Sequence, residues 1–208
     1  MDDFKETYYS LAIKTLRMMK WTILHAPNAK FFIKTDDDVF VNLRNLNDCL
    51  NSKLVSQMYP DFIGGVIHAD REPHTLNSFS KWYAPPMLWN HVKKYIHWKE
   101  TPKLVSYDVF PPYAEGNFYI IAYPLLPKLL NASLSIPLFH LEDVYVTGIV
   151  ASLVPNVHKI DVPYVFSSSS SWPWLSSVVS GLIVSPEEVL AYHCDNYVEF
   201  IEWLHIHV

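Results

Sequence analysis

Three consecutive aspartates lie between two short apolar runs in the stretch KFFIKTDDDVFVNL, which spans residues 30–43. Adjacent carboxylates repel one another and resist burial, so this arrangement needs a positively charged partner. The apolar run before them predicts a short buried strand over 29–33, and the acids follow its end. Any fold for this chain must therefore present a group of acids at the end of a core strand.

The rest of the chain alternates between strand-like and helix-like patterns. Strands are predicted at 29–33, 61–67, 116–122, 160–166 and 189–193, and helices at 4–20, 42–54, 125–130 and 141–154, with a final helix beginning at Asp195 or Asn196. Residues 68–115 contain six prolines and read as an irregular, substrate-facing segment. Alternating strands and helices predict one α/β domain over residues 1–208.

Composition excludes several classes of function. The net charge is −5 without a basic cluster, which argues against binding to nucleic acid. The two cysteines, Cys49 and Cys194, are too few for a disulfide framework or a zinc site of the CxxC type, and whether they pair stays open. The sequence has no apolar run of about 18 residues, so no membrane span is predicted. Asn131-Ala132-Ser133 is a candidate N-glycosylation site.

The acidic triplet has the chemistry of a divalent-cation site. In an extended segment Asp36 and Asp38 share one face and Asp37 the other. Hard carboxylate oxygens at the end of a buried strand suit Mg²⁺ or Mn²⁺ bound together with substrate phosphates. An acidic turn or helix cap is the alternative. A phosphatase of the haloacid dehalogenase class is disfavoured, because Phe40 stands where its motif requires Thr or Val.

A second acidic pair opens the stretch LEDVYVTG at residues 141–148. Glu142 and Asp143 begin a predicted helix, where the helix dipole favours acids, and this alone could explain them. Transfer of a sugar with inversion needs one carboxylate that deprotonates the attacking hydroxyl. A helix terminus near a metal site is a sensible place for such a base.

Five motifs in order carry a resemblance to a known family. They are KTLRMMKW at 14–21, KTDDDVFV at 34–41, KWY at 81–83, PPYAEGNFYI at 111–120 and LEDVYVTG at 141–148. Together, across residues 4–154, they closely resemble the galactosyltransferase family of β-1,3-glycosyltransferases (glycosyltransferase family 31).

The resemblance implies a GT-A-type fold with a mainly parallel twisted sheet flanked by helices. It implies transfer of galactose or an N-acetylhexosamine from a UDP-sugar, with Mn²⁺ or Mg²⁺, to a 3-hydroxyl of an acceptor glycan on a glycoprotein or glycolipid. By position, Asp38 would be the main metal ligand and Asp143 the base, with Glu142 as an acceptor or sugar contact. The other implied site residues are Asp36 and Asp37 at the metal and nucleotide, and Lys81, Trp82 and Gly116 at the donor sugar.

At other positions the sequence departs from the family pattern. His193 would be the third metal ligand, although an alignment through residues 185–188 leaves no histidine there. Glu115 and Asn117 flank Gly116, where relatives usually have small residues, which leaves the choice of donor open. The membrane anchor and first strands of the family are not in this sequence, so we expect an N-terminally truncated domain of a Golgi enzyme. The alternative is an inactive relative that binds a glycan or a partner and lacks a complete nucleotide site.

Overall fold

The computed structural model describes residues 7–37, 39–41, 43, 46–47, 50, 60–96, 109–161, 165–166 and 191–193. The elements are η1 (Tyr8–Ser10), α1 (Leu11–His25), β1 (Phe31–Thr35), β2 (Val39–Val41), β3 (Phe62–His68), α4 (Pro86–Lys93), β4 (Tyr113–Ala122), η2 (Tyr123–Leu125), α5 (Leu126–Ser133), η3 (Val144–Val150), β5 (His158–Asp161), β6 (Val165–Phe166) and β7 (Ala191–His193). The α/β class predicted from the alternating pattern is confirmed.

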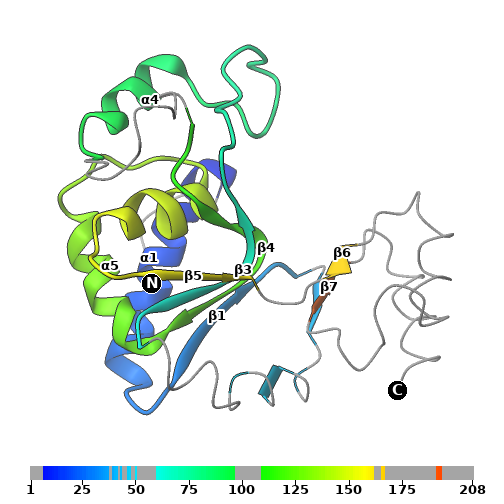
Figure 1. Ribbon diagram of the computed structural model, residues 1–208, viewed down its shortest axis with the longest axis vertical. Helices are drawn as coiled ribbons and strands as arrows, with labels where there is room; N and C mark the ends of the chain where they lie inside the picture. Colours follow the sequence, from blue (N-terminus) through cyan, green and yellow to red (C-terminus); the bar gives the residue numbers. More distant parts are fainter. Residues whose placement is uncertain are drawn as a thin grey trace, which may run out of the picture.

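A four-stranded sheet in the order β1-β4-β3-β5 forms the centre of the described fold, and α1 and α5 lie together on one side of it (Figure 1). A second sheet has the order β2-β7-β6. The central strand β4 is antiparallel to both of its neighbours, and only β3 and β5 pair in parallel in this sheet.

The expectation of a mainly parallel sheet is therefore wrong for the hydrogen-bonded pairs. The reason lies in the segment between β3 and β4. His68 at the end of β3 pairs with Tyr113 at the start of β4, so the chain leaves and re-enters the sheet at the same end. A strand that returns from the end where its neighbour finished must run antiparallel to it.

Strand β4 is buried on both faces, which explains its long apolar run. Tyr119 and Ile121 belong to a core shared with α1, α5 and η3. Phe118 and Ile120 belong to a smaller core on the opposite face, together with Phe62. Because successive side chains of a strand point to opposite faces, both faces of the central strand need apolar residues.

Helix α1 runs further than its predicted range of 4–20. Its buried residues Ala12, Thr15 and Met19 have the helical spacing expected of a core-facing stripe. The helix continues to His25 and ends before Pro27, which cannot supply a main-chain hydrogen-bond donor. The predictions also missed α4, which lies inside the segment expected to be irregular and begins with a proline in its first turn.

Candidate active site

The chain turns at the acidic triplet instead of continuing as an extended strand. The amide of Asp36 donates to the carbonyl of Asn117 across 3.0 Å, and the amide of Val39 lies 3.4 Å from the carbonyl of Asp36. Asp37 is in the turn and exposed. The shared face expected for Asp36 and Asp38 assumed extended backbone, and this assumption does not hold at Asp37. Asp38 itself lies outside the described residues.

Lys34 supplies the positive charge that the acidic triplet requires. Its ammonium contacts Oδ1 of Asp36 and the carbonyl oxygen of Gly116, and only 14% of its side chain is exposed. The same charge acts on the second acidic pair, where it lowers the pKa of both Glu142 and Asp143 against the effect of burial. One largely buried lysine thus contacts the first acidic motif and acts electrostatically on the second.

An irregularity in the sheet brings Gly116 to this place. Gly65 of β3 pairs with Tyr119, whereas Ile67 pairs with Ala114, so β4 contains extra residues in this stretch. Such bulges bend a strand and free main-chain groups from the sheet, often beside active sites. Gly116 lies inside the bulge, so its main-chain N–H is free to donate to a group outside the β3–β4 ladder.

Asp143 receives that amide. The N–H of Gly116 donates to Oδ2 of Asp143 across 3.1 Å, and the N–H of Val144 donates to Oδ1 across 2.8 Å. A Cβ atom on Gly116 would lie 3.2 Å from Oδ2, so any larger residue at this position would displace the carboxylate from its present place. Burial raises the pKa of the Asp143 carboxyl, and the Val144 amide, Lys34 and the Gly116 amide oppose that rise. The carboxylate of Asp143 is thus fixed by two main-chain amides, and its pKa is higher than that of an exposed aspartate.

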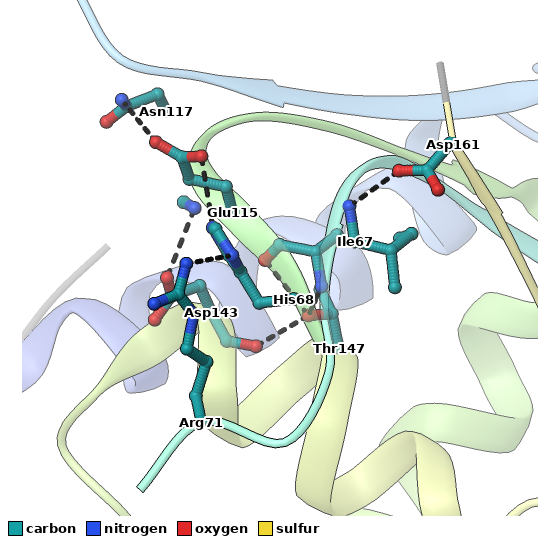
Figure 2. A network of polar contacts seen from close by, with 10 residues as sticks. Ile67, His68, Arg71, Glu115, Asn117, Asp143, Thr147 and Asp161 are labelled. Carbon is teal, nitrogen blue, oxygen red and sulfur yellow. Dashed lines mark hydrogen bonds and ion pairs between the residues drawn. The ribbon is translucent and has the colours of Figure 1, made fainter. Parts of the chain in front are cut away.

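The segment that follows Asp143 is π-helical over Val144–Val150. Thr147 is fully buried there, and its hydroxyl accepts a hydrogen bond from the amide of Ala114 at 2.9 Å. The same oxygen donates to the main-chain carbonyl of Asp143 at 2.6 Å (Figure 2). Short π-helical segments occur frequently at functional sites. The sequence prediction missed Thr147, whose signal was a hydroxyl inside an otherwise apolar run.

Glu142 is buried and hydrogen-bonded in the interior, and its role as a contact with an acceptor sugar stays a prediction. It is 7% exposed, and its Oε1 accepts a hydrogen bond from the hydroxyl of Tyr119 at 2.6 Å. Burial raises the pKa of Glu142 to about 7, although Lys34 and the hydrogen bond from Tyr119 act in the opposite direction. Burial therefore favours the protonated form of this carboxyl relative to an exposed glutamate.

A cavity of about 480 Å³ lies between α1 and β1. Its wall consists of Leu11, Lys14, Thr15, Met18, Phe32, Ile33, Lys34, Thr35, Asp36, Asp37 and Glu142. The acidic turn and Glu142 therefore face one space that is otherwise lined by apolar residues, two lysines and two threonines. A space of this kind has room for part of a ligand with a charged group near the turn.

A polar cluster lies beside the β4 bulge (Figure 2). Glu115 contacts Nε2 of His68 at 3.2 Å, and its Oε1 accepts a hydrogen bond from the side-chain Nδ2 of Asn117 at 3.1 Å. The ring of Tyr113 lies 5.3 Å from that of His68, and Arg71 lies 3.5 Å from its Nδ1. Glu115 and Asn117, the two polar residues that depart from the family pattern beside Gly116, are thus hydrogen-bonded to each other, and Glu115 also pairs with His68.

Lys81, Trp82 and Asn131 are all accessible. The ammonium of Lys81 lies 4.7 Å from the centre of the Trp82 ring, which is 53% exposed and lies beside His74. Neither contact joins this pair to Gly116 or to the acidic motifs. Asn131 is exposed on α5, as an N-glycosylation acceptor must be.

The remaining site predictions reach beyond the described residues. Cys49 and Cys194 lie outside them, as does the final predicted helix. The backbone of His193 is in β7, next to Val39 of β2, and its side chain is not described. Within the described ranges, no three His, Cys, Asp or Glu side chains gather as metal ligands. No helix in the same ranges is both long and apolar enough to cross a membrane.

The chain is similar to known glycosyltransferases over most of its length. The model of the galactosyltransferase family matches residues 1–163. A mouse N-acetyllactosaminide β-1,3-N-acetylglucosaminyltransferase 2 is 32% identical over 162 residues, which are 76% of this chain and 36% of the relative. Human β-1,3-galactosyltransferase 2 is 30% identical over 196 residues, 91% of this chain and 42% of the relative. A rat UDP-GalNAc:β-1,3-N-acetylgalactosaminyltransferase 1 is 32% identical over 167 residues, 77% of this chain and 41% of the relative.

The chain thus spans less than half the length of these relatives. Among solved structures, a glycosyltransferase involved in glycosylation of the major capsid of PBCV-1 aligns with a TM-score of 0.44 at 10% identity, covering 99% of this chain and 80% of that one.

Proposed function

Because the chain belongs to the galactosyltransferase family, we propose that it acts as a metal-dependent, inverting hexosyltransferase domain. The donor would be a UDP-sugar carrying galactose or an N-acetylhexosamine, and the acceptor a 3-hydroxyl of a glycan on a protein or lipid. The names of the relatives support these sugars and the β-1,3 linkage, and the name of the rat relative includes the donor UDP-GalNAc. The proposed place of action is the Golgi lumen, where a glycan on the exposed Asn131 would be expected.

The observation that carries the proposal is the placement of Asp143. Its carboxylate is fixed by two main-chain amides, its pKa is raised by burial, and Lys34 connects its surroundings to the acidic turn at Asp36. A general base needs this combination, namely a fixed position and a pKa closer to the working pH.

In the proposed reaction, Asp143 accepts the proton of the acceptor hydroxyl as that oxygen attacks C1 of the donor sugar. The bond between the acceptor oxygen and C1 forms while the bond between C1 and the diphosphate oxygen breaks, and UDP leaves with the electron pair. A single displacement of this kind inverts the configuration at C1. The Gly116 and Val144 amides hold the carboxylate in place throughout.

The carboxylates of the acidic turn are the type of ligand that a divalent cation such as Mn²⁺ or Mg²⁺ prefers. Asp36 keeps 42% of its side chain exposed, and both Asp36 and Asp37 line the cavity, so hard oxygen atoms are accessible there. Asp36 and Asp38, with His193, would hold the cation. When bound, Mn²⁺ or Mg²⁺ would offset the charge of the diphosphate leaving group.

The test is a transfer assay with purified protein, Mn²⁺ and each of UDP-galactose, UDP-N-acetylglucosamine and UDP-N-acetylgalactosamine. Product formation on a glycan acceptor is expected, and Asp143→Asn should lower kcat by at least about a hundredfold. Retained transfer in Asp143→Asn would refute the base assignment. Calorimetry with UDP and Mn²⁺ distinguishes this function from the alternative, an inactive relative that binds a glycan or a partner. A folded sample that gives no heat would favour the inactive relative.

A further inference from the structure

Thr147 carries a buried hydroxyl that the proposed chemistry does not yet use. The residue is 0% exposed and lies in the apolar π-helical segment that follows Asp143. Its oxygen accepts from the amide of Ala114 at 2.9 Å and donates to the carbonyl of Asp143 at 2.6 Å, with the carbonyl of Ala114 as a second acceptor at 3.3 Å. One hydroxyl thus joins strand β4 to the residue proposed as the base.

In addition to the side-chain hydrogen bond from Tyr119 to Glu142, two main-chain amides of β4 are hydrogen-bonded to residues 143–147. Ala114 is joined to Thr147, and two residues further along the strand Gly116 is joined to Asp143. A single connection would let the strand pivot about one point, whereas two fix its direction and distance. The geometry of the Gly116–Asp143 hydrogen bond therefore depends on the connection at Thr147.

Close packing supports the same connection. A Cβ atom on Gly148 would lie 3.0 Å from Cβ of Tyr113 and 3.2 Å from the carbonyl of Pro111, so the strand lies directly against the segment. A larger residue at position 148 would push the strand away by a few tenths of an ångström. Thr147 reaches the strand because its neighbour leaves no gap.

An ordinary role for Thr147 has to be considered. Threonine in a helix commonly donates to the carbonyl four residues before it, as Thr22 does to Met18 at 2.9 Å. Thr147 differs because the same oxygen also accepts the amide of a strand that holds part of the site. Thr22 is therefore a matched control, having the local bond without a connection to a strand.

We propose that Thr147 is a positioning residue, which holds Asp143 in register with the Gly116 amide by bridging Ala114 to the main chain of Asp143. The catalytic part of this inference rests on the proposed role of Asp143 as the base. The geometric part stands on the contacts alone. A hydroxyl at position 147 would then be required for efficient proton transfer and dispensable for binding of either substrate.

The experiment compares Thr147→Val, Thr147→Ala and Thr147→Ser with Thr22→Val. Steady-state kinetics are corrected for the folded fraction, and amide hydrogen exchange of Gly116 is measured by NMR. We expect Thr147→Val to lower kcat about 10- to 100-fold with KM unchanged within about twofold. Thr147→Ser should restore kcat to within about threefold of wild type, and Thr22→Val should match wild type. Thr147→Ala serves the same purpose as Thr147→Val if the valine variant does not fold.

The exchange measurement does not require catalysis. In Thr147→Val the Ala114 amide loses its acceptor and should exchange faster, and we expect faster exchange of the Gly116 amide as well, with the β4 amides from Phe118 onward unchanged. An unchanged rate at Gly116 would overturn the inference whether or not the protein transfers sugar. Equal losses of kcat in Thr147→Val and Thr147→Ser would overturn the positioning role. If the wild type transfers no sugar while Gly116 exchange responds as expected, the proposed function fails and the geometric inference stands.

Discussion

The main-chain amide of Gly116 lies 3.1 Å from Oδ2 of Asp143, although 27 residues separate them in the chain. The carbonyl oxygen of the same glycine contacts the ammonium of Lys34, which also contacts Asp36. Gly116 is therefore bonded on one side to the proposed base and on the other to the lysine beside the acidic turn. A displacement of Gly116 would therefore disturb both the position of the Asp143 carboxylate and that of the Lys34 ammonium beside Asp36.

The first prediction concerns Gly116→Ala. The new Cβ atom would lie 3.2 Å from Oδ2 of Asp143 and 3.4 Å from its Cβ and Cγ, so the carboxylate must shift. We expect kcat to fall about 10- to 100-fold, with a cost of about 1–2 kcal/mol in the free energy of unfolding. Ile121→Val, a buried change on the same strand, should have a comparable effect on stability and leave kcat per folded molecule unchanged. Equal kcat values for the two variants would contradict the prediction.

Parts of this arrangement were accessible from the sequence. The acids at 36–38 and at 142–143 were identified by their position against apolar runs, and the strand that carries Gly116 was placed correctly. A glycine between two polar residues inside an apolar strand is itself a signal of a bulge or a close backbone approach. Gly116 entered the prediction through the family resemblance instead, as part of the donor pocket.

The remaining features depend on pairings that sequence reasoning does not supply. The extra residues of β4 become visible only against β3, because a bulge is defined by the partner strand. The interior position of Glu142 depends on Tyr119, since only the pairing of strand and segment brings that hydroxyl to it. Consecutive residues of a helix point in different directions, and so Glu142 and Asp143 separate into an interior and a strand-facing role.

The second prediction concerns the pH dependence of stability and Glu142. Its folded-state pKa of about 7 lies above the unfolded value of 4.5, so between these values the folded chain binds more protons. The free energy of unfolding should therefore decrease as the pH rises from about 5 to about 7, by at most about 3 kcal/mol. Glu142→Gln should flatten this dependence, leaving a smaller slope of the same sign from Asp143, whose pKa is also raised.

Urea unfolding at several pH values between 5 and 8 measures this effect. Tyr119→Phe should act in the opposite direction, because loss of the hydroxyl that stabilises the ionised form raises the pKa of Glu142 further. An identical pH dependence in wild type and Glu142→Gln would show that Glu142 titrates normally.

The third prediction concerns Lys34→Met. Removing the ammonium raises the pKa of Asp143 and of Glu142, because the charge of Lys34 lowers both. The acid limb of the pH profile of kcat/KM should move to higher pH, with a loss on the order of tenfold at pH 6 and a smaller one at pH 8. Lys128→Met is the control, since Lys128 also contacts an aspartate, Asp61, but is 48% exposed. A uniform loss at all pH values would contradict the electrostatic explanation.

The fourth prediction concerns Lys159, on β5 next to Ile63 of β3. Its ammonium nitrogen is buried and has no hydrogen-bond partner within the described part of the chain, and burial lowers its pKa to about 7. The unfolded chain, with a lysine pKa of 10.5, binds more protons between pH 7 and pH 10.5, so stability should rise with pH across this window. Below pH 7 the folded chain carries the full cost of a buried charge.

Lys159→Met should remove that cost while keeping a long apolar stem in the same place. We expect the variant to exceed wild type in free energy of unfolding by about 2–3 kcal/mol at pH 6, and by clearly less at pH 9. Urea unfolding at both pH values tests this, with Lys20→Met on the exposed face of α1 as a control that should change little at either pH. A destabilised Lys159→Met variant at pH 6 would contradict the prediction, because it would show that the ammonium has a favourable partner in the folded chain. Lys159 would then resemble Lys34, whose ammonium contacts Asp36.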